Sequence, residues 1–242
     1  MLIIFIKWVI KITGEINNLR LKIDKIDKDI ISLILERMNL VKNVGNIKNI
    51  DNSRVYVPER EALIFKNLSN FSSLSPKEIQ SIYTEIISSC RRLENTISVA
   101  VLKNSSSLLA LKKIFGEYVN PIYFSNFQKF ISIDSNIKYM LISFSKDMIE
   151  AIKENNWFII NSVTIDNEKY FLLSKFPNTI SIEGEISFFL SNDYLNSYSI
   201  QIKENLFFTA IEGFFNNENK MKALSNSYPN VFIQLVGSTV EI

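Results

Sequence analysis

Residues 15–49, EINNLRLKIDKIDKDIISLILERMNLVKNVGNIKN, decide the fold of the first part of this 242-residue chain. Apolar side chains recur along this stretch at alternating steps of three and four residues, and no proline interrupts it. Such spacing is typical of a coiled-coil-like seam on one long helix. The seam consists of Ile16, Leu19, Ile23, Ile26, Ile30, Leu33, Leu40, Val44 and Ile47.

Two shorter helices are predicted after it. Pro58 suits the first position of a helix, and the acidic residues just behind it favour the positive N-terminal end. The serine-rich stretch 69–73 is expected to break this helix. Ser75-Pro76-Lys77-Glu78 has the pattern of a capping box, so a third helix should begin there and end near Glu94.

Beyond this point short apolar runs alternate with helical patterns, which indicates mixed α/β structure. Strands are expected near 97–102, 121–124, 138–144 and 157–164, with helices at 108–115 and 146–155. After Pro177, strands at 180–190, 197–202, 206–212 and 231–236 and a helix at 217–225 suggest a second small α+β unit. The predicted division is an N-terminal extension (1–14), a helical domain (15–95) and two further regions (96–176 and 177–242).

Composition narrows the possible chemistry. The formal net charge of +2 gives no reason to expect nucleic acid as a partner. The chain has no histidine, which excludes His-based catalysis and argues against a metal site, and its lone Cys90 excludes an internal disulfide. The apolar N-terminus is broken by Lys7 and Lys11 and is too short to span a membrane, so we interpret it as a packing extension or an over-long start rather than a membrane anchor.

Arg37 occupies a position on the apolar seam where leucine is expected. An unpaired buried guanidinium is costly, so the residue either fixes coiled-coil register or binds an anion. Lys48 follows three turns later on the same side, and Glu94 continues the apolar face of the third helix. Arg20 adjoins the seam roughly 25 Å from Arg37, so one small ligand could meet both only if two chains pair.

Arginine is confined to the first part of the chain, and none follows Arg92. Because lysine supplies most of the positive charge, the remaining arginines suggest bidentate binding of carboxylates. Arg91 and Arg92 are sufficiently explained as surface residues of a helix. Arg37 is not, because of its place on the seam.

The pattern Leu19-Arg20-x-x-Ile23-Asp24, with Leu35-Glu36-Arg37, Val44-Gly45-x-x-Lys48 and Pro58-Glu59-Arg60-Glu61, resembles the all-helical chorismate mutases. It is most similar to the mutase part of bifunctional chorismate mutase–prephenate dehydratases. The resemblance implies an intertwined, all-α homodimer of three-helix chains that converts chorismate to prephenate in the cytoplasm. It implies no cofactor, and no membrane or nucleic-acid partner.

The resemblance also assigns roles. Arg37 and Arg20 of the partner subunit would hold the substrate carboxylates, with Arg60 in support. Lys48 and a protonated Glu94 would donate to the ether oxygen. The remaining substrate contacts would be Glu61, at the ring hydroxyl, Cys90, where some members have a hydroxyl, and Val57, where other members have a polar residue.

The regions after residue 95 resemble the other parts of the same bifunctional enzymes in reduced form. Ile97–Leu102 and Asn167–Leu173 are similar to strands of the dehydratase domain, but the Gly-rich opening and the Thr-Arg-Asp signature have no counterpart. Residues 206–213 and 231–237 resemble half of an ACT regulatory domain. We expect mutase activity alone. The alternatives are an enzyme that still has both activities and a helical dimer without catalysis.

Overall fold

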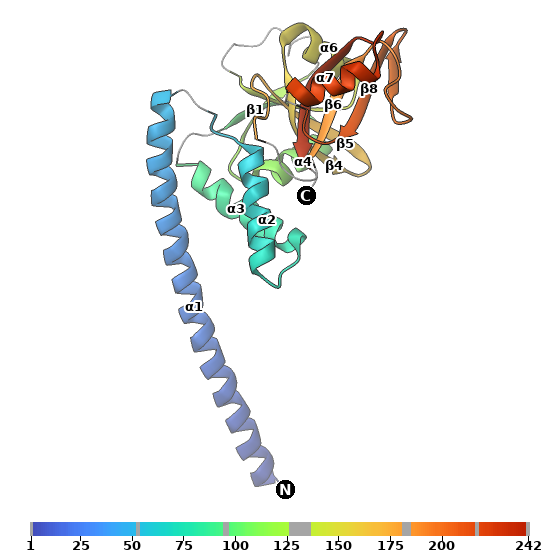
Figure 1. Cartoon of the computed structure of the whole chain (residues 1–242). Coiled ribbons are helices and arrows are strands. Elements are labelled where there is room, and N and C mark those ends of the chain that lie inside the picture. Colours follow the sequence, from blue (N-terminus) through green and yellow to red (C-terminus); the bar gives the residue numbers. More distant parts are fainter. Residues whose placement is uncertain are drawn as a thin grey trace.

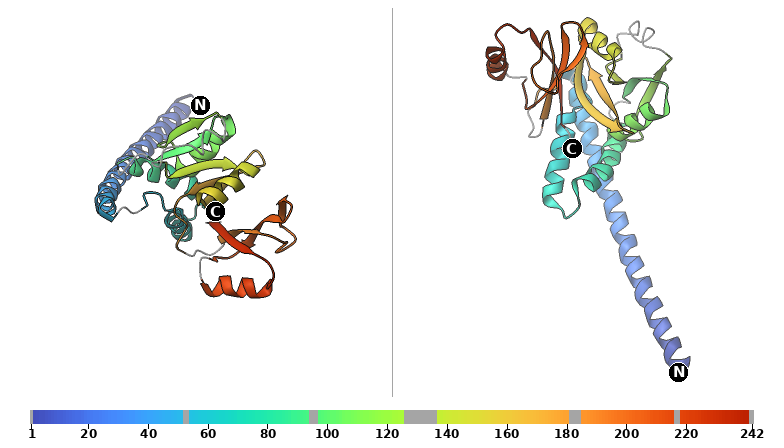
Figure 2. Two further views of the ribbon diagram at one scale, coloured as in Figure 1. Left: turned by 90° about the horizontal axis from the view of Figure 1, so that it is seen from above. Right: turned by 90° about the vertical axis from the view of Figure 1, so that its right-hand side faces the viewer.

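One long helix, α1 (Leu2–Asp51), dominates the N-terminal part of the computed structural model (Figure 1). The structure describes residues 2–51, 54–93, 97–125, 137–180, 185–215 and 218–240, with the side chains of 2–12, 48–51, 105 and 240 outside that description. The long helix is confirmed, but it begins at Leu2, so the stretch expected to be a separate extension continues the helix. Its N-terminal half projects away from the remainder of the molecule (Figure 2).

The two shorter helices form a hairpin beside the C-terminal half of α1. Helix α2 (Pro58–Phe71) ends at Phe71, so the predicted break within the serine-rich stretch is confirmed. Helix α3 (Pro76–Arg91) has the predicted capping box: Glu78 N–H donates to Ser75 Oγ at 3.3 Å, and Ser75 N–H donates to Glu78 Oε2 at 2.8 Å. Helix α3 packs against both α1 and α2.

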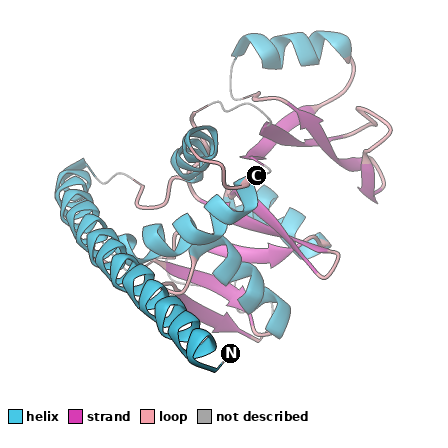
Figure 3. Ribbon diagram, turned by 90° about the horizontal axis from the view of Figure 1, so that it is seen from below, coloured by secondary structure: helices cyan, strands magenta, loops and turns pink. Residues whose placement is uncertain are grey.

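The predicted strands and helices after residue 96 are present, with shifted ends. Figure 3 shows the strands in magenta and the helices in cyan. The helices are α4 (Ser105–Phe115), α6 (Lys146–Asn155) and α7 (Glu218–Ser227). The strands are β1 (Ser98–Leu102), β2 (Asn120–Phe124), β3 (Tyr139–Ser143), β4 (Phe158–Ile165), β5 (Glu168–Ser174), β6 (Glu185–Ser191), β7 (Ile200–Lys203), β8 (Leu206–Glu212) and β9 (Ile233–Val240).

All of these strands belong to one sheet, in the order β2-β1-β3-β5-β4-β9-β6-β8-β7. Strands β1, β2 and β3 pair in parallel, most of the other neighbours are antiparallel, and β4 pairs in parallel with β9. Strand β9, the last of the chain, lies between β4 and β6, so the two predicted regions share one continuous sheet, and their division near residue 177 stays a prediction. A separate ACT-like unit is not distinguished within this sheet.

The junction of the two halves of the sheet depends on Gly237, which pairs with Ile159 across β4 and β9. Gly237 has φ of +136°, and a Cβ atom there would lie 2.1 Å from the carbonyl oxygen of Ile159. A side chain is therefore excluded both by conformation and by space.

The sheet has a buried core on each face. On one face α6 packs over a cluster that includes Met148, Phe171 and Phe208. On the other face α4 covers a cluster into which Tyr56, from the segment between α1 and α2, inserts its ring. The helical hairpin is thereby tied to the sheet. Among the described residues, no helix is long and apolar enough to cross a membrane.

Candidate functional site

Arg37 and Cys90 are brought together between α1 and α3. Arg37 Nη1 donates a hydrogen bond to Cys90 Sγ at 2.8 Å, and the guanidinium is half-buried while the cysteine is buried. Arg37 faces α3 together with the half-buried Met38 and Val41, whereas its seam neighbours Leu33 and Leu40 are exposed. A cation held at this helix–helix contact is suited to binding an anion.

Glu61 of α2 lies on the other side of the C-terminal end of α3, where it pairs with Arg91. The Arg91 Nη2 to Glu61 Oε1 distance is 2.7 Å, and only 5% of the arginine side chain is exposed. Its guanidinium also lies over the rings of Tyr56 and Phe115, with its Cζ atom at 5.3 and 5.6 Å from their centroids. The interpretation of Arg91 as a surface residue was wrong, whereas Arg92 is exposed and lies over Tyr118.

Helical phase could have identified Arg91. It follows Ile87 by four residues, so it belongs to the buried face of α3 that the apolar pattern already defined. We assigned it to the surface because a charged residue near a helix end usually lies in solvent. The two aromatic rings that receive it come from outside the three helices, so no local pattern pointed to them.

The other predicted site residues are dispersed within this single chain. Arg20 and Arg60 are exposed on α1 and α2. Val57 is half-buried at the N-cap of α2, where its side chain can make no cap hydrogen bond. The side chain of Lys48 and the whole of Glu94 lie outside the described residues.

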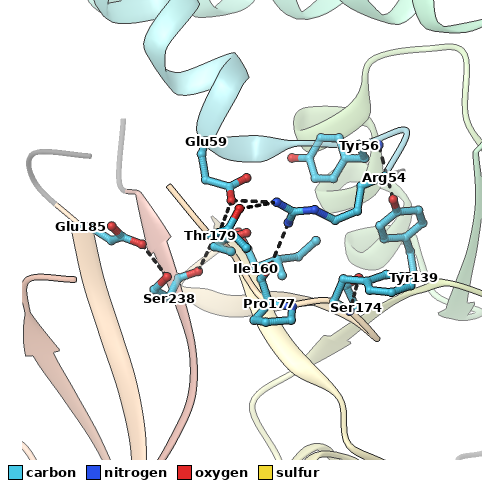
Figure 4. Close-up of polar contacts among 12 residues, drawn as sticks. Arg54, Tyr56, Glu59, Tyr139, Ile160, Ser174, Pro177, Thr179, Glu185 and Ser238 are labelled. Carbon is cyan, nitrogen blue, oxygen red and sulfur yellow. Dashed lines mark hydrogen bonds and ion pairs between the residues drawn. The ribbon is translucent and has the colours of Figure 1, made fainter. Parts of the chain in front are cut away.

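Glu59, which was not among the predicted site residues, joins α2 to the sheet region. Its Oε1 atom accepts from Arg54 Nη2 at 3.1 Å and from the backbone N–H of Thr179 at 2.8 Å, and Arg54 Nη1 donates to the carbonyl of Pro177 at 3.0 Å (Figure 4). The carboxylate is fully buried. Burial of a charge is tolerated only with such partners, so this network fixes the first turn of α2 against the sheet.

Tyr56 is held just beside this network. Its backbone N–H donates to Tyr139 Oη at 3.3 Å, as Figure 4 shows, and its own Oη accepts from Asn161 Nδ2 at 2.7 Å. Burial, with a further contribution from the Glu61 carboxylate, raises the pKa of Tyr56 well above its ordinary value. The ring is therefore a neutral phenol whose position is set by β3 and β4.

A cavity of about 560 Å³ is lined by residues of α2, α3, α4 and β4. Its walls include Tyr56, Glu59 and Glu61, while Lys77 and Lys112 lie among the lining residues on the helices at either side. Arg37 and Cys90 do not line this cavity. Glu61 thus faces the space between the helical hairpin and the sheet.

A comparison with known protein families finds a match for the helical part of the chain. Residues 19–95 match the family model described as chorismate mutase type II. The expected resemblance to the all-helical chorismate mutases is confirmed over these residues. They contain every predicted site residue of this chain.

One curated relative is the protein named bifunctional chorismate mutase/prephenate dehydratase of Aquifex aeolicus. It is 43% identical over 94 residues, which are 36% of this chain and 26% of that protein. The chain therefore spans about a quarter of the length of this relative.

Solved structures are similar at much lower identity. One is the structure titled as a novel type of quorum-quenching acylase, GqqA, which is 12% identical and has a TM-score of 0.49. The similarity covers 60% of this chain and 95% of the GqqA chain. The prephenate dehydratase of Streptococcus mutans is 11% identical, covers 60% and 97%, and has a TM-score of 0.42.

Proposed function

We propose that this chain is a chorismate mutase, which rearranges chorismate to prephenate within the helical region. The observation that carries the proposal is the Arg37–Cys90 contact, made by two predicted site residues within the part that matches the mutase family. A seam arginine that only fixed coiled-coil register would need a polar partner on a second α1 helix. Here its partner is a residue of α3 in the same chain.

The reaction suits the residues available. A [3,3] sigmatropic shift needs no nucleophile, metal or general base, and this chain has no histidine to supply one. It needs the substrate held in a compact conformer, with negative charge stabilised on the breaking C–O bond. Arg37 would bind a substrate carboxylate, and Lys48 with a protonated Glu94 would donate to the ether oxygen.

We further propose that the working unit is a homodimer, in which Arg20 of the partner subunit completes the site. The support is the apolar seam of α1, of which Leu19, Leu33 and Leu40 are 58%, 64% and 61% exposed in one chain. Unpaired apolar side chains in a row along a helix are suited to a second copy of that helix. The length of α1 also separates Arg20 from Arg37 too far for one small ligand within one subunit.

Three substrate contacts complete the proposed site. Glu61 would accept from the ring hydroxyl, Arg60 would support the carboxylate side, and the Cys90 thiol would take the place of a hydroxyl. Val57 stands where other chorismate mutases of this family have a polar residue, so its side chain would make no hydrogen bond to the substrate. We place the enzyme in the cytoplasm, without cofactor.

The direct test is the loss of chorismate and the formation of prephenate by the purified full-length chain. Saturable prephenate formation above the uncatalysed rate is expected. The second candidate is an enzyme with both activities, favoured by the name of the Aquifex relative. Because the dehydratase signature has no counterpart here, we expect no phenylpyruvate when prephenate is supplied. Phenylpyruvate formation would establish the second candidate instead.

A further inference from the structure

We propose that Arg91 is a positioning residue for the mutase site and that the sheet region, through Arg91, sets the place of Glu61. The inference rests on the proposed function for the role of Glu61 toward substrate. It adds a residue to that role and gives the sheet region a part in the reaction without any chemistry of its own.

The first link is between Arg91 and Glu61. A glutamate side chain has several rotatable bonds, so a useful hydrogen-bond acceptor must be held in one of its rotamers. The 2.7 Å bond from Arg91 Nη2 fixes one carboxylate oxygen, and both groups are largely buried. A buried charge-assisted bond of this length is among the strongest that a protein offers.

The second link is between Arg91 and the sheet region. Arg91 Nη1 donates to the carbonyl oxygen of Phe115, at the end of α4, at 3.4 Å. The rings of Phe115 and Tyr56, 4.6 Å apart at their centroids, lie on the guanidinium. Tyr56 is held in turn by Asn161 of β4. The guanidinium therefore has its direction fixed by groups whose places depend on the folded sheet.

The third link is the position of Arg91 in α3. Its neighbour in sequence, Cys90, accepts the hydrogen bond from Arg37. The last turn of α3 thus orients two proposed substrate-binding groups, Arg37 on the α1 side and Glu61 on the α2 side. A shift of this turn would change the distance between them, and misplacement by about 1 Å is enough to cost a large part of the rate.

The test uses the full-length chain and measures kcat and KM for chorismate. Arg91→Met keeps the bulk and removes the charge, and we expect kcat/KM to fall about tenfold, mainly through KM. Glu61→Gln should lower it by a similar factor, and the double variant should be no worse than the worse single one. Arg91→Lys keeps the charge but not the planar guanidinium, so its kcat/KM should lie between those of Arg91→Met and the wild type. Arg92→Met, the exposed neighbouring arginine, is the matched control and should equal wild type.

A second measurement separates this inference from the proposed function. Hydrogen exchange of the backbone amides in the first turn of α2 should be faster in Arg91→Met than in Arg92→Met, whether or not the wild type is active. If Arg91→Met does not fold, Asn161→Ala replaces it, with an expected rise in KM of about threefold. Unchanged exchange and unchanged KM, or effects of Arg91→Met and Glu61→Gln that multiply in the double variant, would overturn the inference. An inactive wild type with faster exchange in Arg91→Met would overturn only the mutase proposal.

Discussion

Apolar side chains are buried in the sheet region but exposed along the long helix α1. Leu173 in β5 and Ile159 in β4 are completely buried within one chain, whereas Leu33 on α1 is 64% exposed. The sheet has helices on both faces and a tyrosine from the helical part in one of its cores. The difference teaches that one chain completes the core of the sheet region, whereas the seam of α1 stays exposed in one chain, as the proposed dimer requires. Burial of a leucine side chain stabilises by about 1.5–3 kcal/mol, so the seam is a strong drive to association.

The largest effect is expected where this asymmetry is attacked directly. Leu33→Glu would place a charge from each subunit in the proposed helix pairing, and it should raise the dissociation constant of the dimer about 100-fold or more. Sedimentation velocity over a range of protein concentrations measures this. Lys28→Glu, on the opposite side of the same helix, should leave the dimer intact. A wild type that sediments as a monomer at all concentrations would break the comparison.

The packing of the sheet region is tested at Gly237, where β4 and β9 approach each other closely. Gly237→Ala should lower the free energy of unfolding by about 3 kcal/mol or more, since it combines an unfavourable φ with a clash against Ile159. Gly213→Ala is the matched control, because Gly213 also has positive φ but a Cβ there would only reach ordinary contact with Phe215. Urea denaturation should show the larger loss at Gly237. Equal losses at the two glycines would contradict the role of the close approach between β4 and β9.

The smallest effect is expected at the capping box of α3. Ser75→Ala should cost about 1 kcal/mol in urea unfolding, whereas Ser81→Ala, inside the same helix, should cost little or nothing. Hydrogen bonds from Ser75 lower the pKa of Glu78, so the folded state favours the ionised form. The stabilising contribution is therefore present at neutral pH and is lost as pH falls below the ordinary range of a glutamate toward the lowered pKa. The gap between Ser75→Ala and wild type should narrow in acid, and a gap that widens there would contradict this.

Much of the fold could be predicted from local pattern. The three-four spacing of α1, the capping box at Ser75 and the short apolar runs after residue 96 each reflect residues near one another in sequence. The single sheet could not be predicted, because the pairing of β4 with β9 joins segments far apart in the chain. Nothing in either strand alone specifies that partner, and only the need for a glycine at position 237 marks the place.

The site was predicted in the same uneven way. Arg37 was identified because a charged residue interrupted an apolar period, and the structure places it against Cys90. Arg91 was assigned to the surface, and its partners Glu61, Tyr56 and Phe115 could not be recognised because they come from three other segments. The link through Glu59 to Thr179 was likewise invisible, since the two residues meet only when the sheet forms.

The central claim is that a seam arginine of α1 binds chorismate for rearrangement. It is tested most directly by the rate of prephenate formation by the wild type, Arg37→Ala and the exposed-arginine control Arg92→Ala. The account predicts that Arg37→Ala lowers kcat/KM about 100- to 1,000-fold while Arg92→Ala retains the wild-type value. A wild type without activity, or an Arg37→Ala variant as active as the control, would contradict it.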